Sequence, residues 1–253
     1  MFSANGQDAI AIAAWRRGWD TYERRLPAFY AASIRDGDTV IDAGANTGYY
    51  ALLAASVATG VHVHALEPYP PVADLLDQNI SMNPQGRQVL VHRIAVDNTT
   101  GRAELHIPLG AHALIETSAS IETTFRDAWS HSVVVPRTTI DLLAESLARV
   151  DVMKVDVECL EDRVLEGAFS TLTRHRPIVF YEVLDCDDWH ANYTRLDGIR
   201  QAADYVSVRL REQGAIISPS VGYDEPWRNQ ALWPAERLAD LRQVCARLRY
   251  NLQ

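Results

Sequence analysis

A short turn with two glycines, placed between an apolar strand and a helix, constrains the fold of this chain more than any other feature. The strand predicted at residues 39–42 ends on Asp42 and runs into the segment GANTG. Residues 49–58 then have helical composition, and residues 61–66 again have the composition of a strand. This order predicts a βαβ unit, in which a crossover helix joins two parallel strands.

The alternation of strands and helices continues to the end of the 253-residue chain. It predicts a single α/β domain over residues 1–253, with a mostly parallel, doubly wound, Rossmann-like sheet. Within this domain, residues 1–36 are expected to form a helical cap that breaks near Pro27, and residues 37–253 are expected to form the core. Later strands are predicted at 89–94, 150–155 and 178–183, helices at 71–79, 159–173, 195–212 and 235–249, and a closing hairpin from AIISPS and NQALWP.

One segment interrupts this alternation between residues 100 and 136. The stretches GRAELHIPL and SVVVP have the composition of strands, and they flank a polar stretch rich in Ser, Thr and Glu. We therefore expect an inserted β segment over the edge of the sheet where ligands bind.

The net charge and the cysteines limit the binding partners and the cellular compartment that we expect for this protein. The formal net charge is −9, so the sequence offers no long-range attraction for nucleic acid or for anionic lipid. The three cysteines, Cys159, Cys186 and Cys245, are far apart, which favours reduced thiols and a cytoplasmic protein. An apolar stretch at residues 9–15 has no basic residue before it and two arginines after it, so it predicts neither a signal peptide nor a membrane span.

The glycine turn predicts a ligand close to its main chain. Glycine has no Cβ, so Gly44 and Gly48 let a bound molecule approach the backbone. A dinucleotide fingerprint would place a third glycine where this chain has Asn46, which weakens the prediction of a diphosphate ligand. The pattern suits a ligand with an amino acid end and a nucleoside end, because Asp42 can help to hold an ammonium group while the amides of the turn meet a carboxylate. S-adenosylmethionine is such a ligand.

A second acid, Glu67, supports a nucleoside at this position. It closes the second predicted strand about 20 residues after Gly48, where a βαβ unit places a carboxylate against two ribose hydroxyls. NAD would use the same acid. An NAD-dependent enzyme therefore remains an alternative, as does a protein that binds the cofactor without catalysis.

Charged residues near the end of another predicted strand are the candidates for catalysis. Strand side chains alternate, so Lys154, Asp156 and, if the extended chain continues, Glu158 point to one face. The strand IVFYEV places Glu182 at the same edge of the sheet. Asp156 is the candidate base or orienting group, supported by Glu158, while Lys154 fixes the local charge. Glu182 would steer the acceptor. The alternative to a catalytic role is a purely structural ion pair between Lys154 and Asp156.

Repulsion between the two neighbouring acids must be relieved. A proton, the cation of Lys154 or a divalent ion such as magnesium could each relieve the repulsion between Asp156 and Glu182. No octahedral ligand set can be recognised from the spacing, so no metal ligand is assigned and magnesium stays an alternative.

Several motifs follow one another in an order that is more specific than any single glycine turn. They are VIDAGANTGYYALLAA, VHALEPYPPVADLLDQNISMN, VHRIAVDNTTG, TTIDLL, MKVDVECLEDRVLEGA and PIVFYEV, and they lie within a match over about residues 20–185. This set resembles the FkbM family of class I S-adenosylmethionine-dependent methyltransferases. The resemblance implies a Rossmann-like fold with a seventh, antiparallel strand, and methyl transfer to a hydroxyl of a sugar, polyketide or other natural product.

The chain departs from the family at one position of the motif DvEG, where Cys159 replaces the glycine. A small apolar substitute is our interpretation of Cys159, and a catalytic cysteine is the alternative.

The turn chemistry and the resemblance together give each cofactor-binding residue a role. Asp42, Gly44, Asn46 and Gly48 are expected at the methionine end, Glu67 and the following Pro68 at the ribose, and Ile94, Ala95, Val96 and Asp97 at the adenine. The expected function is an S-adenosylmethionine-dependent O-methyltransferase with a small-molecule hydroxyl acceptor. Neither nucleic acid nor a membrane is expected as a partner, and a homodimer is left open.

Overall fold

The first predicted βαβ unit is present and sets the direction of the main sheet. The structure is a computed structural model that describes residues 16, 18, 23, 25–108, 119–121, 129–184, 189–211, 214–223 and 228–253. In it, β1 (Thr39–Ala43) and β2 (His62–Leu66) pair in parallel and are joined through α3 (Tyr49–Val57). All five residues of β1 are buried, which is typical of a central strand covered on both faces.

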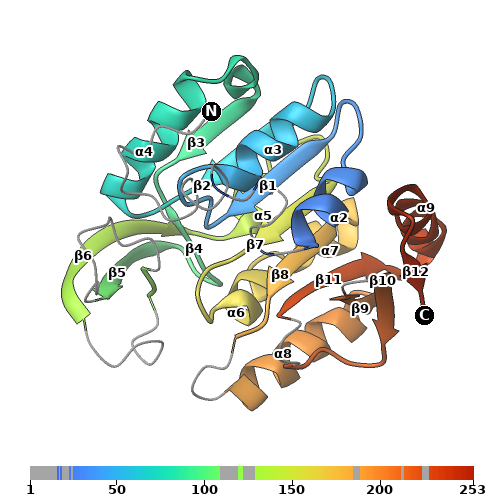
Figure 1. Cartoon of the computed structure of the whole chain (residues 1–253). Coiled ribbons are helices and arrows are strands. Elements are labelled where there is room, and N and C mark those ends of the chain that lie inside the picture. Colours follow the sequence, from blue (N-terminus) through green and yellow to red (C-terminus); the bar gives the residue numbers. More distant parts are fainter. Residues whose placement is uncertain are drawn as a thin grey trace.

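The main sheet is mostly parallel. Its other strands are β3 (Val89–His92), β7 (Val152–Val155), β8 (Ile178–Glu182), β9 (Tyr205–Arg211), β10 (Gly214–Ser218), β11 (Asn229–Pro234) and β12 (Asn251–Leu252). Over the described residues the order is β12-β10-β9-β11-β8-β7-β1-β2-β3 (Figure 1). The strands from β3 through β1 to β8 are parallel, whereas β11 is antiparallel to both of its neighbours, β8 and β9. The predicted Rossmann-like α/β fold with an antiparallel strand near its end is confirmed.

Helices cover both faces of this sheet and enclose two hydrophobic cores. They are α2 (Leu26–Ser33), α4 (Pro70–Ser81), α5 (Ile140–Ala144), α6 (Glu161–Glu166), α7 (Phe169–His175), α8 (Trp189–Ala202) and α9 (Leu238–Leu248), with 3-10 turns at Pro84–Gln88 and Ala235–Arg237. Side chains of α2, α3, α4 and α9 pack on one face with Val40 and Val152. Side chains of α5 to α8 pack on the other face with Ile41 and Met153, the next residues along the same strands. Within the described ranges, no helix is long and apolar enough to span a bilayer.

A second sheet carries the expected inserted segment. It contains β4 (Ala95–Val96), β5 (Gly101–Pro108) and β6 (Trp129–Thr138), with β6 in the middle, and it extends away from the main sheet on the left of Figure 1. The two long strands occur where GRAELHIPL and SVVVP predict them, and Leu105 and Ile107 bury against Ala95. The β structure expected within residues 100–136 is therefore confirmed. Most of the polar stretch between the strands lies outside the described residues.

Two expectations about the C-terminal half are wrong. The helix predicted at 195–212 ends at Ala202, and Tyr205–Arg211 is the strand β9, because its side chains alternate in burial and both of its edges are paired. The strands β10 and β11 exist, but they do not form a hairpin with each other. Both pair with β9, which lies between them.

The helix predicted over 159–173 is also divided. It forms α6 and α7, separated by residues 167 and 168. The carboxylate of Asp141 accepts hydrogen bonds from the main-chain N–H groups of Ser170 and Thr171, at 3.0 and 2.7 Å. These bonds satisfy amides of the first turn of α7, so a new helix begins there.

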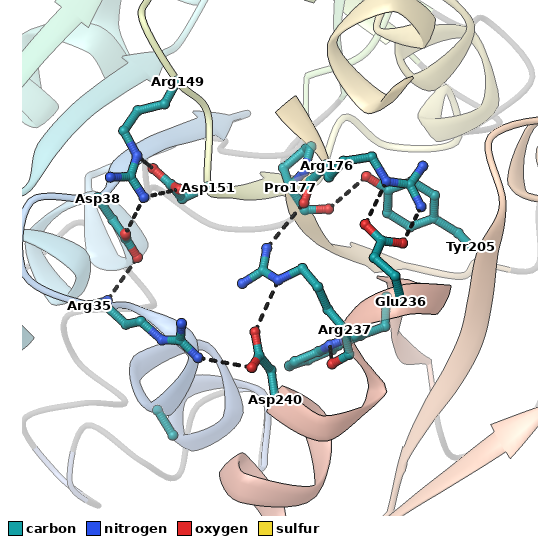
Figure 2. A network of polar contacts seen from close by, with 12 residues as sticks. Arg35, Asp38, Arg149, Asp151, Arg176, Pro177, Tyr205, Glu236, Arg237 and Asp240 are labelled. Atoms are coloured by element: carbon teal, nitrogen blue, oxygen red, sulfur yellow. Dashed lines mark hydrogen bonds and ion pairs between the residues drawn. The ribbon is translucent and has the colours of Figure 1, made fainter. Parts of the chain in front are cut away.

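Charged residues connect the strands at the amino edge of the parallel sheet (Figure 2). Arg149 binds Asp38, just before β1, at 3.4 Å and Asp151, just before β7, at 2.5 Å. Arg176, just before β8, binds Glu236 at 2.6 Å. Arg149 thus joins the starting points of β1 and β7, and Arg176 joins the start of β8 to the turn that follows β11.

The state of Cys159 differs from the reduced thiol that the sequence predicts. It is disulfide-bonded, whereas Cys245 is a free, buried thiol and Cys186 lies outside the described residues. The prediction of reduced thiols is therefore wrong for Cys159. Distance along the sequence does not prevent pairing, because the chain returns to the same edge of the sheet after each parallel strand. A sulfur held in a disulfide is not a thiolate, so the catalytic-cysteine alternative loses its support.

Candidate functional site

A cavity opens at the carboxyl edge of the parallel strands, opposite the charged network of Figure 2. The space within it that a water-sized molecule can occupy is about 140 Å³. Leu105 and residues 119–121 form part of its wall, and the Ser120 hydroxyl donates to the carbonyl oxygen of Glu158 at 2.9 Å. The inserted β segment therefore lies over this edge, as expected.

The predicted site residues fall into two groups. Gly44, Asn46, Glu67, Pro68, Ala95, Val96, Asp156, Glu158 and Glu182 line the cavity, together with Ile94. The described lining does not include Asp42, Gly48, Asp97 or Lys154.

The glycine turn after β1 packs against the end of β7. A Cβ on Gly44, whose φ is +79°, would lie 1.8 Å from the carbonyl oxygen of Asp156, so only glycine fits there. Asn46 also has a left-handed backbone, with φ +52°, and lines the cavity. At Gly48 a Cβ would lie 2.6 Å from a side chain of α4, so this glycine lets α3 pack closely on α4. The two glycines therefore have different roles.

Glu67 is held by two main-chain amides. Its Oε2 accepts from the N–H of Asn46 at 3.0 Å, and its Oε1 accepts from the N–H of Tyr69 at 2.9 Å. Burial raises the pKa of Glu67 to about 7, although these two amides act to lower it. Each carboxylate oxygen has a further lone pair, so Glu67 can also accept from a pair of hydroxyls in the cavity.

Asp42 and Lys154 face each other beneath the turn, at paired positions of β1 and β7. Both are buried, and the Oδ2 of Asp42 has no hydrogen-bond partner among the described residues. Burial raises the pKa of Asp42 to about 7, although Lys154 acts to lower it. Burial alone would lower the pKa of Lys154, but the carboxylates of Asp156, Glu23 and Asp42 raise it overall. Lys154 therefore stays cationic in the interior.

The strand β7 ends at Val155, earlier than the predicted alternation requires. Glu158 and Cys159 have φ values of +58° and +75°, which are incompatible with an extended strand. The Val157 N–H donates to the Glu161 carboxylate at 3.1 Å, so the chain is already turning into α6. The expectation that Glu158 shares a strand face with Asp156 is wrong, and a turn brings Glu158 to the cavity.

Asp156 and Glu182 come together at the ends of adjacent strands. The Nζ of Lys154 donates to Asp156 Oδ2 at 2.8 Å. Burial, followed by the charge of Asp156, raises the pKa of Glu182 to about 8. The cation of Lys154 thus stabilises the Asp156 carboxylate, and the raised pKa of Glu182 lets that side chain hold a proton near neutrality. The repulsion expected from the sequence is relieved by these two means.

The described residues give no support to the magnesium alternative. Among them, no group of three or more His, Cys, Asp or Glu side chains is arranged to hold a metal ion.

The predicted adenine segment is only partly a cavity wall. Ile94, Ala95 and Val96 line the cavity and present apolar surface. The carboxylate of Asp97 is instead bound by Arg137 at 2.7 Å and by Arg163 at 2.6 Å, and it is fully buried. Asp97 therefore connects β6 to α6, and its side chain does not face the cavity.

Sequence reasoning missed Glu23 and Tyr50. Glu23 precedes α2 and lines the cavity, and the Tyr50 hydroxyl donates to Glu23 Oε2 at 2.5 Å. No motif or strand end marks Glu23. Tyr50 follows the glycine turn directly, and its place in the first turn of α3 was a signal that could have been used.

The donor set fits a ligand that has a nucleoside end and an amino acid end. Glu67 can accept from a diol beside an apolar wall, and Asp42, whose Oδ2 has no hydrogen-bond partner among the described residues, is buried beneath the glycine turn. Carboxylates also line the cavity where β7 and β8 end. These features suit the positive charges of S-adenosylmethionine.

Comparisons with known proteins agree with this interpretation. A family model described as "Methyltransferase FkbM domain" matches residues 42–207. Among curated proteins, the chain is 30% identical over 175 residues to "31-O-demethyl-FK506 methyltransferase FkbM" from Streptomyces tacrolimicus. This match covers 54% of the chain and 62% of the relative, so the chain spans less than two thirds of that protein.

Solved structures share the fold. The chain is similar to the methyltransferase FkbM from Methylobacillus flagellatus KT, with a TM-score of 0.50 and 14% identity over 89% of this chain and 55% of the other. It is also similar to a putative rRNA-methylase from Clostridium thermocellum, with a TM-score of 0.50 and 7% identity over 82% and 91% of the two chains. At these identities the similarity concerns the arrangement of helices and strands alone.

Proposed function

The chain belongs to the FkbM methyltransferase domain family, and we propose that it is an S-adenosylmethionine-dependent methyltransferase that acts on a hydroxyl group of a small molecule. The observation that carries this proposal is the pair of carboxylates, Asp156 and Glu182, beside a cavity whose other end suits a nucleoside. The printed name of the curated relative, which specifies an O-methyl position, supports a hydroxyl acceptor.

The cofactor would be held by the first two strand ends. Glu67 would accept from the ribose hydroxyls, and the apolar side chains of Ile94 and Val96, with the backbone of Ala95, would contact the adenine. Gly44 and Asn46, which line the cavity, would lie beside the amino acid end, while Asp42 adds negative charge beneath the turn. When bound, S-adenosylmethionine supplies an electrophilic methyl group. Gly48 and Asp97 support this region through packing and ion pairs, without direct contact.

The acceptor would lie over the ends of β7 and β8. Lys154 holds the Asp156 carboxylate in one orientation, so Asp156 can accept a hydrogen bond from the acceptor hydroxyl and then its proton. Glu182, whose pKa burial raises to about 8, can orient the same hydroxyl in either protonation state. Alignment of the acceptor and exclusion of water, by Glu158 and residues 119–121, would supply much of the remaining rate enhancement.

The charge of the cavity disfavours an anionic acceptor. The described lining contains Glu23, Glu67, Asp156, Glu158 and Glu182 and no Lys, Arg or His. Phosphate groups would be repelled by this lining, which argues against nucleic acid and sugar phosphates as acceptors. Carboxylates are good acceptors for the hydroxyls of sugars and polyols.

Transfer of a labelled methyl group tests the proposal. The protein would be incubated with methyl-labelled S-adenosylmethionine and a metabolite extract of compounds below about 1 kDa, fractionated by charge. We expect label in a neutral compound, in a form that survives mild base, as an ether methyl does and a methyl ester does not. Label in an N-methyl or C-methyl group of the isolated product, or in base-labile esters alone, would contradict the hydroxyl assignment, and binding of S-adenosylhomocysteine without any transfer would favour a non-catalytic binding protein.

The Asp156→Asn variant tests the role of the base. We expect turnover to fall about 100-fold or more, since loss of a general base typically costs this much. The affinity for S-adenosylhomocysteine should stay within about threefold, because Asp156 lies at the acceptor side. Asp74→Asn, an exposed change of the same type, is the matched control. Full activity of Asp156→Asn would remove Asp156 from the mechanism.

A further inference from the structure

The segment before α2 delivers a carboxylate into the cavity. Glu23 has a left-handed backbone, with φ +51°, and its carbonyl oxygen accepts from the N–H of Leu26 at 3.3 Å and from Asn229 Nδ2 at 3.5 Å. These contacts fix the backbone of Glu23 to the start of α2 and to the start of β11. The side chain therefore reaches a cavity that is otherwise built from the carboxyl edge of the sheet.

Tyr50 connects Glu23 to the charged centre of the site. Its hydroxyl donates to Glu23 Oε2, while its ring lies 4.6 Å from the Lys154 Nζ in a cation–π contact. Lys154 in turn binds Asp156. Glu23 is thus the outer end of a chain of contacts that leads to the proposed base.

The charges of this cluster do not balance. Glu23, Asp42, Asp156 and Glu182 surround Lys154, and the negative charge of Glu23 acts on the pKa values of Asp42, Lys154 and Glu182. In a buried setting, this excess of carboxylates favours a ligand that brings positive charge. The sulfonium form of the cofactor has such a charge at its reactive centre, and the thioether left after methyl transfer does not.

We propose that Glu23 is a specificity-determining residue that makes the cavity prefer the sulfonium cofactor to its neutral thioether product. The proposal rests on the proposed function, because it concerns the ligand of the same site. Tyr50 holds the Glu23 carboxylate at the cavity, so the segment before α2 contributes to the release of the product as well as to the binding of the cofactor.

Calorimetry with two stable ligands tests this role. Sinefungin has an amine-bearing carbon in place of the sulfonium and is cationic there, whereas S-adenosylhomocysteine is neutral at the same position. In Glu23→Gln we expect the Kd of sinefungin to rise about tenfold and the Kd of S-adenosylhomocysteine to change less than threefold. Tyr50→Phe keeps the ring over Lys154 and loses the hydroxyl, so it should shift the same ratio by a smaller factor, and it provides a second test if Glu23→Gln folds poorly.

Glu145→Gln is the matched control, because it removes an equal charge from an exposed position after α5. The ratio of the two Kd values should not change in this variant. Equal weakening of both ligands in Glu23→Gln and Tyr50→Phe would show a structural role only and overturn the proposal, as would an unchanged ratio in both. If the unaltered protein binds neither ligand, the proposed function itself fails.

Discussion

Glu67 is the side chain on which the proposed nucleoside half of the site depends most directly. Its two oxygens already accept main-chain amides from Asn46 and Tyr69. In Glu67→Gln, an amide NH₂ would face one of these N–H donors, and the remaining oxygen could no longer serve both hydroxyls of a diol. We expect the affinity for 5′-methylthioadenosine, which has the nucleoside and lacks the amino acid, to fall at least tenfold.

The same variant should weaken S-adenosylhomocysteine by a similar factor, because both ligands have the ribose. Isothermal titration calorimetry measures both affinities, with Glu145→Gln as the charge control. A loss seen with S-adenosylhomocysteine alone would place Glu67 at the amino acid end and contradict the ribose assignment.

Single residues differ in how well the sequence identifies them. Gly44, Glu67 and Glu182 lie at the ends of predicted parallel strands, and such ends share one edge of a sheet, so the sequence alone was enough to place them at the cavity. Asp97 has the right position but a different partner, since two arginines from distant segments bind it. Glu23 could not be predicted, because its position depends on contacts with α3 and β11 that no local pattern encodes.

At the scale of elements, the contact of the β1 turn with the end of β7 determines whether the cavity can form. Gly44→Ala would place a Cβ 1.8 Å from a main-chain oxygen that has little room to move, and it would also strain a φ of +79°. We expect a loss of about 3 kcal/mol or more in the free energy of unfolding, with loss of cofactor binding.

Gly37→Ala separates the two causes. Gly37 has a similar φ of +75°, but a Cβ there would meet no atom within 4 Å. This variant should lose only about 1–2 kcal/mol, the cost of the left-handed backbone. Urea unfolding of both variants gives the comparison. Equal losses would show that the backbone conformation alone, and not the packing of the turn on β7, requires glycine at position 44.

The elements that the sequence did not predict are those that depend on contacts with other segments of the chain. Tyr205–Arg211 follows a genuine helix, and its strand state depends on the edges that β10 and β11 provide. The early end of β7 likewise depends on the turn into α6, where the Glu161 carboxylate binds the Val157 amide. The central βαβ units were predicted because their apolar runs and turns are local features.

At the scale of the whole molecule, buried carboxyl groups connect stability to pH. Burial raises the pKa of Asp42 and Glu67 to about 7 and that of Glu161 to about 8. Unfolded carboxyl groups have pKa values of about 4, so above that pH the folded chain binds more protons than the unfolded chain. The free energy of unfolding then decreases as pH rises towards 8. His64 and His92, whose pKa values burial lowers, act in the opposite direction only below about pH 6.5.

We therefore expect the melting temperature of the ligand-free protein to fall by about 10 °C between pH 6.5 and 8, since the three groups together lose about 3 kcal/mol of stabilisation and each kcal/mol lowers it by about 2–4 °C in a domain of this size. Glu161→Gln removes one titrating group while its amide oxygen can still accept from Val157, so the slope should be flatter in this variant. Scanning calorimetry in buffers with small ionisation enthalpies measures both proteins. A melting temperature that rises over this range would contradict the buried, protonated state of these groups.

The charged network in Figure 2 has a consequence for how this protein can change. Arg149 and Arg176 fix the starting points of three parallel strands at the edge opposite the cavity. The described parts of the loops that follow those strands lie at the opposite edge of the sheet, away from these ion pairs. We therefore expect substitutions in these loops to change the lining of the cavity while the ion pairs stay intact, which makes this chain a suitable starting point for directed evolution of the cavity.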